Sequence, residues 1–160
     1  MKLFGDLLRR DKPLAQAVLK GGEEASGLYG KVNFYPAFEG VLICAEIFDL
    51  PKGEGNCPGK TFGFHIHEGK SCSGTKDDPF SSAGMHYNPG NCPHPAHAGD
   101  MPPLMTDGGG YAWMAFYTKR ITMSEVIGRT VVIHSNPDDF HSQPSGNSGK
   151  KIACGVIKQM

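Results

Sequence analysis

The stretch TFGFHIHE, residues 61–68, has the alternation that is typical of a β-strand. Successive side chains of a strand point to opposite faces, so Phe64 and Ile66 share one face while His65 and His67 share the other. We expect the two apolar side chains to lie in a hydrophobic core. Two imidazoles at this spacing can bind one transition metal ion, but an ordinary exposed strand face is the commoner explanation of such a pair taken alone.

Seven further runs share this character, because they alternate or are rich in β-branched and aromatic residues and are bounded by Gly, Pro or Asp. They cover residues 14–20, 28–36, 40–50, 103–106, 111–118, 129–135 and 151–158. The DGGG segment at 107–110 predicts a hairpin turn between two of them. Eight short strands without a strong internal helix predict an all-β fold, an antiparallel sandwich or barrel.

The chain of 160 residues has the size of one domain, which we expect to span 1–160 with residues 1–13 as an N-terminal extension. In that extension Leu3, Phe4, Leu7 and Leu8 have helical spacing and predict a short helical turn packed on the body. A weak membrane-surface anchor is the alternative.

The composition argues against two classes of protein, although it does not exclude a local charged patch. Lys plus Arg number 16 and Asp plus Glu number 16, so the bulk charge argues against a nucleic-acid binder. No apolar run is long enough to span a membrane. The N-terminus lacks the features of a secretory signal, which predicts a cytoplasmic protein; the trimmed mature chain of a periplasmic or extracellular protein would look the same.

Two segments, 69–101 and 136–150, are too long to be simple turns, and loops of this length are usually functional or disordered. The first contains three histidines and an aspartate within fifteen positions, namely His86, His94, His97 and Asp100. Three imidazoles and a carboxylate match a closed four-coordinate zinc site, and a solvated polar loop is the alternative. His134 ends the run at 129–135 and is a further candidate ligand.

Five motifs in order carry a family resemblance: GFHIHE, AGMHYNP, HAGD, GRTVVIHSNPDDF and GNSGKKIACGVI. On these motifs the chain, from about Leu14 to Ile157, resembles the copper,zinc superoxide dismutase family. The resemblance implies an eight-stranded Greek-key β-sandwich or barrel with two long metal-site loops. It also implies copper and zinc as cofactors and the conversion of superoxide to dioxygen and hydrogen peroxide.

The resemblance also implies a role for each site residue. Copper is expected at His65, His67, His86 and His134, and zinc at His86, His94, His97 and Asp100. His86 is expected to bridge both ions and to take part in catalysis by carrying a proton. Asp138 is expected to link the two sites through hydrogen bonds to His65 and His94, which fix imidazole orientation.

Five cysteines leave at least one unpaired within the chain. The resemblance pairs Cys72 with Cys154 in a disulfide. Cys57 and Cys92 either form a second disulfide or remain two free thiols. Cys44 lies in an apolar run and is expected to behave as a small hydrophobic residue.

The sequence departs from the family pattern at Lys151, where an Arg that guides superoxide is expected. Lys keeps the charge but lacks the planar guanidinium, so we expect an activity that is reduced but not abolished. Few charges lie in the segment 136–150, so steering of the anion is expected to depend on Lys150, Lys151 and the copper itself. His141 has no assigned role; it is expected to be a solvated loop residue, the alternative being a pH-dependent charge near the channel mouth.

Two other functions fit the same donor set. One is a non-catalytic protein that binds or buffers copper and zinc on the same fold, and the other is an enzyme loaded with zinc alone. The resemblance leaves the oligomeric state open between a homodimer and a monomer.

Overall fold

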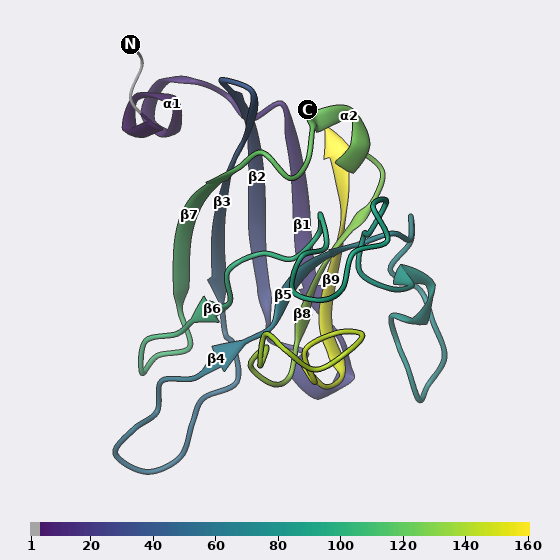
Figure 1. The fold of residues 1–160 in the computed structure, drawn as a ribbon. Helices are drawn as coiled ribbons and strands as arrows, with labels where there is room; N and C mark the ends of the chain where they lie inside the picture. Colours follow the sequence, from purple (N-terminus) through teal and green to yellow (C-terminus); the bar gives the residue numbers. More distant parts are fainter. Residues whose placement is uncertain (1–3) are drawn as a thin grey trace.

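A computed structural model describes residues 4–160, and its main feature is one strongly curled antiparallel sheet (Figure 1). The strand order is β5-β8-β9-β1-β2-β3-β7. The bounds are Ala15–Gly21 for β1, Tyr29–Ala37 for β2, Gly40–Phe48 for β3, Phe64–His67 for β5, Ala112–Thr118 for β7, Thr130–His134 for β8 and Lys151–Gln159 for β9. The all-β antiparallel prediction is therefore confirmed.

A second sheet and four short helices complete the fold of the described part of the chain. Strand β4 (Thr61–Phe62) pairs with β6 (Leu104–Met105). The helices are α1 (Phe4–Arg10), η1 (Glu23–Ala25), η2 (Ser81–Ala83) and α2 (Met123–Val126). Helix α1 confirms the predicted N-terminal helical turn, although Leu3 lies outside the described residues. Among residues 4–160, no helix is long and apolar enough to cross a membrane.

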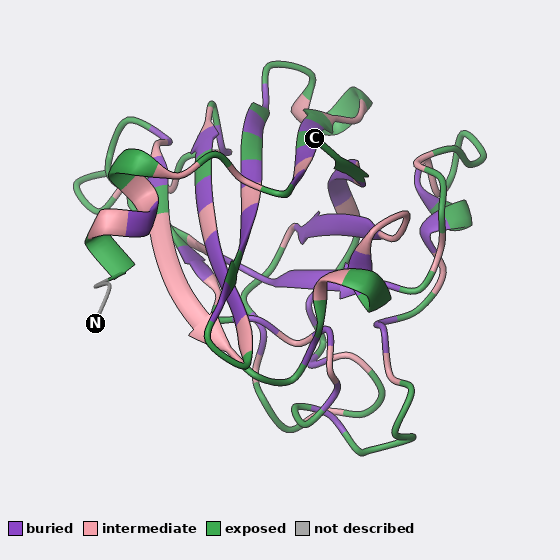
Figure 2. Cartoon of the chain, turned by 90° about the horizontal axis from the view of Figure 1, so that it is seen from above, coloured by how far each residue is buried: buried purple, intermediate pink, exposed green. Residues whose placement is uncertain are grey.

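The last strand of the chain joins the two halves of the sheet. Strand β9 pairs with β8 on one side and with β1 on the other, so that Ile157 lies opposite Ala17. The concave side of the sheet carries the core, and Figure 2 shows buried residues alternating with exposed ones along several strands. Phe64 and Ile66 are fully buried in this core, as the alternation of residues 61–68 predicted.

The predicted strand at 61–68 is divided in two by Gly63. Its N–H donates to the Asn136 carbonyl and its carbonyl accepts from the His134 N–H, so the chain is held there by residues next to β8. Residues 4–160 therefore contain nine strands rather than the eight expected, because β4 leaves the main sheet to pair with β6.

The turn at 107–110 exists, but it does not close a hairpin. The Gly110 N–H donates to the Asp107 carbonyl, which makes the turn tight. Strand β6 pairs with β4 and β7 pairs with β3, so the turn connects two different sheets. The prediction of a hairpin at this turn is wrong, because β4 competes for β6.

Helix α2 was not predicted, although its signal is present in the sequence. The Glu125 carboxylate accepts hydrogen bonds from the Thr122 N–H and hydroxyl at 2.7 Å and 2.6 Å. Thr followed three residues later by Glu is the capping-box pattern that starts a helix.

Strand β5 lies at one end of the sheet order, and a loop covers its outer edge. The Ile66 N–H donates to the Gly99 carbonyl, and the Ile66 carbonyl accepts from the Tyr87 N–H, both at 2.8 Å. Two residues later, the Glu68 N–H donates to the Met85 carbonyl at 2.9 Å. The loop that carries the histidine-rich motif is therefore fixed against the strand that carries His65 and His67.

Candidate metal centre

Six histidines and one aspartate gather where β5 and β8 meet the two long loops. His65 and His67 leave β5 on the face opposite Phe64, and His134 ends the neighbouring strand β8. Isolated β-bridges pair His67 with His86 and His65 with Asp100, so the loop residues lie directly beside the strand residues. Strand alternation and loop pairing together bring all these side chains to one place.

The first group of donors consists of four buried imidazoles, those of His65, His67, His86 and His134. One ligand atom from each lies within 4.8 Å of the others. The Nδ1–H groups of His67 and His134 donate to the carbonyls of Gly84 and Gly149, at 2.9 Å and 3.2 Å. Their Nε2 atoms, 3.1 Å apart, are thereby left to face the group.

The second group consists of His86, His94, His97 and Asp100, again with ligand atoms within 4.8 Å of one another. The Asp100 carboxylate lies 2.9 Å from His86 Nδ1, 3.1 Å from His94 Nδ1 and 3.4 Å from His97 Nδ1. His86 is a member of both groups, with Nδ1 directed toward Asp100 and Nε2 left for the first group.

The unpartnered atoms show that these residues fit metal ions. His65 Nδ1, His86 Nε2 and His94 Nδ1 are buried without a hydrogen-bond partner among residues 4–160. A buried polar atom without a partner is costly, and native proteins rarely leave one. Four imidazoles suit copper, and three imidazoles with a carboxylate suit zinc, so each orphaned nitrogen lies where a metal bond satisfies it.

Burial keeps the imidazoles of His65, His67 and His134 neutral, which is the form that binds metal. Burial lowers the pKa of His65 to about 4 and that of His134 to about 3, against an ordinary value of 6.5. The pKa of His67 is lowered well below 6.5, again chiefly by burial. All three are therefore unprotonated at neutral pH.

Asp138 connects the two groups as predicted. Its Oδ2 accepts a hydrogen bond from His65 Nε2 and its Oδ1 accepts one from His94 Nε2, both at 2.8 Å. Burial alone would raise the pKa of this carboxyl, but hydrogen bonds from both imidazoles and from the Phe140 N–H hold it well below its usual range. The carboxylate stays ionised and orients one imidazole of each group.

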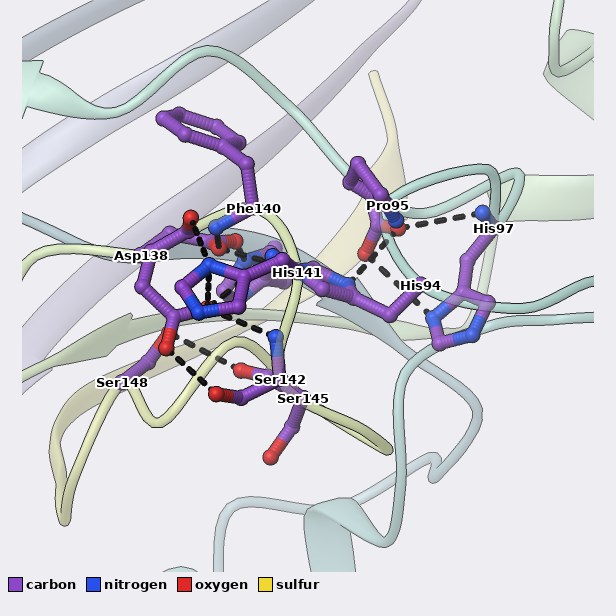
Figure 3. Close-up of polar contacts among 12 residues, drawn as sticks. His94, Pro95, His97, Asp138, Phe140, His141, Ser142, Ser145 and Ser148 are labelled. Carbon is purple, nitrogen blue, oxygen red and sulfur yellow. Dashed lines mark hydrogen bonds and ion pairs between the residues drawn. The ribbon is translucent and has the colours of Figure 1, made fainter.

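The segment 138–148 folds around Asp138, and Figure 3 shows His94 and His97 beside it. Gly146 approaches so closely that a Cβ there would lie 2.0 Å from Asp138 Oδ1 and 2.6 Å from His94 Nε2. Its φ of +68° is also in the region that favours glycine. Both features require glycine at this position.

A cavity of about 360 Å³ opens onto the first group. Its lining includes His67, His86 and His134 together with Ile152 and Lys151. The Lys151 side chain is 17 % exposed, and its Nζ donates to Asp78 Oδ2 at 2.9 Å. The cavity therefore presents the Lys151 ammonium group, paired with Asp78, together with three copper-group histidines.

Comparison with known proteins agrees with this geometry. The family model described as copper/zinc superoxide dismutase (SODC) matches residues 28–157. The chain belongs to the copper/zinc superoxide dismutase family. The first group is thus the copper site and the second the zinc site, with His86 bridging them, as the sequence predicted.

Individual relatives extend over most of the chain. A copper-zinc superoxide dismutase of Aquifex aeolicus is 38 % identical over 144 residues, covering 81 % of this chain and 79 % of the relative. That of Saccharomyces cerevisiae is 38 % identical over 160 residues, covering 89 % and 96 %. The solved Cu/Zn superoxide dismutase of Brucella abortus superposes with a TM-score of 0.75 at 28 % identity, covering 90 % and 99 %.

The structure confirms the predicted disulfide and shows which of the two alternatives holds for Cys57 and Cys92. Cys72 and Cys154 form the predicted disulfide, with an S–S distance of 2.01 Å. Cys57 and Cys92 are exposed free thiols, so the second disulfide between them is not formed. Cys44 is half-buried and packs against the small outer cluster that contains Leu42, as expected of a small hydrophobic residue.

His141 is a solvated loop residue. Its side chain is 79 % exposed, and its Nδ1–H donates to the Asp139 carbonyl at 2.8 Å. Among the described residues it does not line the copper cavity, which disfavours the alternative role at the channel mouth.

Sequence reasoning missed two residues that act on the site. The Gln143 amide accepts from the His94 N–H at 2.9 Å and donates to the His94 carbonyl at 2.7 Å, so it clamps the backbone of a zinc ligand. Asp78 binds Lys151 in the cavity. No sequence pattern indicates either contact, because the partners are 49 and 73 positions apart.

Proposed function

We propose that this chain disproportionates superoxide, converting two superoxide anions and two protons into dioxygen and hydrogen peroxide. The observation that carries the proposal is the shared residue His86, which belongs to both donor groups and lines the cavity. A protein that only stored two metals would have no need for a common ligand that faces an anion-accessible cavity.

Four imidazoles, those of His65, His67, His86 and His134, would hold copper; His94, His97 and Asp100 would hold zinc with His86. When bound, copper supplies reversible one-electron chemistry, and zinc supplies positive charge and fixes the His86 ring. The chain's own contribution is to hold and move a proton at His86 Nε2, the nitrogen that faces the copper group. Asp138 keeps the rings of His65 and His94 in place meanwhile.

Lys151 is proposed to guide the anion. Its ammonium group lies in the cavity with the copper ligands, where it attracts superoxide and donates hydrogen bonds to it. Because an ammonium group lacks the flat pair of donors of a guanidinium, it holds the anion in a less defined orientation. This difference supports an activity lower than that of a chain with Arg at the same position.

The deciding experiment measures metal content and superoxide turnover on the same sample. We expect one copper and one zinc per chain, and rapid decay of superoxide generated by pulse radiolysis. Stoichiometric metal without turnover would establish the storage function instead. Turnover lost when copper alone is removed, with zinc retained, would exclude an enzyme that works with zinc only.

Two features remain predictions. A homodimer is one, and light scattering distinguishes it from a monomer by a twofold difference in mass. The cytoplasmic compartment is the other, and cell fractionation tests it.

A further inference from the structure

The copper cavity carries more negative than positive side chains. Its lining includes three lysines and four carboxylate residues, namely Lys76, Lys150, Lys151, Glu23, Glu24, Asp77 and Asp78. A cavity that captures an anion is expected to present uncompensated positive charge. The carboxylates therefore need an explanation that the capture of superoxide does not give.

Asp78 is the carboxylate that lies closest to the chemistry, because it binds Lys151 directly. Its Oδ2 accepts from Lys151 Nζ at 2.9 Å, and its own side chain is 44 % exposed. The backbone around it is fixed: its N–H donates to the Thr75 hydroxyl, and its carbonyl accepts from the Thr75 N–H. Asp78 thus holds the ammonium group at a defined place.

The disulfide ties the same loop to the same strand. Cys72 lies six positions before Asp78, and Cys154 lies three positions after Lys151 on β9. Val132, Phe80 and Ala83 pack around the disulfide as a small buried cluster. The ion pair therefore lies close to a covalent link between the loop and β9.

Lys150, which directly precedes β9, is also paired with a carboxylate. Lys150 Nζ donates to Glu24 Oε1 at 2.6 Å, and this carboxylate raises the pKa of Lys150. Both side chains are mostly exposed, at 69 % and 64 %, so this pair is more strongly screened by water than the pair of Asp78 and Lys151.

We propose that Asp78 is a positioning residue that fixes the Lys151 ammonium group beside the copper ligands and, through its charge, limits the long-range capture of superoxide; Glu24 acts on Lys150 in the same direction but more weakly. The inference rests on the proposed dismutase function. The physical reason is the dependence of the field on distance. Two opposite charges in contact attract a distant anion far less than a single ammonium group does. Close to Lys151, however, the free N–H groups can still bind the anion.

The test replaces the charge but keeps the hydrogen-bond acceptor. Asp78→Asn is expected to raise kcat/KM for superoxide about twofold to threefold at low ionic strength, as expected for one unit charge near the path of the anion. The gain should disappear as salt is added, because the steering field is screened. Glu24→Gln should show a smaller gain with the same dependence on salt.

Glu39→Gln is the matched control. Glu39 forms an exposed ion pair with Lys119, and neither residue lines the cavity. The control removes one negative charge from the molecule without touching the site, and its kcat/KM should equal that of the parent protein. A gain in the control as large as in Asp78→Asn would overturn the proposal.

A binding measurement gives a readout other than turnover. Azide titrated into the copper- and zinc-loaded protein, followed by visible absorption, should bind about twofold to threefold more tightly to Asp78→Asn at low salt, and unchanged to Glu39→Gln. Disulfide content by mass and zinc content confirm that the variant is folded. If Asp78→Asn does not fold, Glu24→Gln carries the test, because it changes an exposed pair.

The outcomes separate the two proposals. A fully loaded parent protein without turnover contradicts the dismutase function, while the azide titration still reports on Asp78. Normal turnover of the parent, together with unchanged or lower kcat/KM and azide affinity in both cavity variants, overturns the role of Asp78 and Glu24.

Discussion

At the scale of single residues, Asp138 shows how much of a metal site lies outside its ligands. Its carboxylate accepts two hydrogen bonds of 2.8 Å, one from the copper ligand His65 and one from the zinc ligand His94. It fixes which nitrogen of each ring is free to bind metal. The two sites are therefore joined twice, by the shared imidazole of His86 and by Asp138.

Replacing Asp138 should weaken zinc binding with the ligands intact. Asp138→Asn removes the charge and one of the two acceptors, so we expect zinc affinity to fall about 10- to 100-fold. Competition with a chromophoric chelator measures this. Asp49→Asn is the control: Asp49 is exposed with φ of 55°, a conformation that Asn adopts readily, so affinity there should not change. Equal affinities in both variants would contradict the role of Asp138.

Lys151 gives the second prediction at this scale. Lys151→Arg supplies a planar pair of donors to superoxide, so kcat/KM should rise by roughly twofold or more. Lys151→Met, which removes the charge, should lower it. Lys119→Arg, at an exposed pair remote from the cavity, should have no effect. An unchanged or lower kcat/KM in Lys151→Arg would show that the guanidinium is not what the cavity lacks.

At the scale of elements, the segment 138–148 packs closely against Asp138 and the zinc ligand His94. Gly146 is the point of closest approach, and Gln143 clamps the backbone of His94 from the same segment. This loop is short of charge, but it is rich in residues that pack and donate hydrogen bonds. Its role in the structure is to hold Asp138 and His94 rather than to steer ions.

Gly146→Ala tests this packing. The added Cβ would meet Asp138 Oδ1 and His94 Nε2, so we expect lower zinc affinity together with a loss of stability of about 2–4 kcal/mol. Gly128→Ala is the matched control, since Gly128 also has positive φ, at +89°, but nothing within 4 Å of the new Cβ. The control should lose only about 1 kcal/mol and no zinc affinity, as measured by urea unfolding and chelator competition.

The elements also show what the sequence alone could predict. All eight runs contain strands, because alternation of period two reports directly on a half-buried sheet. The division at Gly63 and the pairing of β4 with β6 depend on contacts with Asn136 and Leu104, which no local pattern encodes. The metal ligands can be predicted from the five motifs in their family order. The spacing of the histidines alone is equally compatible with an ordinary polar strand face or loop. The ion pair of Lys151 was missed because Asp78 lies in an irregular loop.

At the scale of the whole molecule, the buried histidines His65 and His134 make the metal-free protein sensitive to acid. The pKa values of His65 and His134 are about 4 and about 3 in the folded chain, below the 6.5 of an unfolded one. Between these values the unfolded chain binds more protons, so the free energy of unfolding falls as the pH falls.

We therefore expect the metal-free protein to be less stable at pH 5 than at pH 7, by about 2 kcal/mol for each of these two histidines. Urea unfolding at the two pH values measures the difference. His141→Gln, which removes an exposed histidine, should leave that difference unchanged. Equal stability at pH 5 and pH 7 would show that these imidazoles are not buried in the metal-free state.

The loop that covers the outer edge of β5 has a consequence beyond the metal site. Backbone groups of Tyr87 and Gly99 bind Ile66 on that edge, and both lie in the segment that carries the zinc ligands. We expect the loss of zinc to loosen this segment, which would free the outer edge of β5 to pair with other chains, while its inner edge stays paired with β8. We expect chains that are starved of zinc to assemble through β5, so that metal supply decides whether this protein stays dispersed or aggregates.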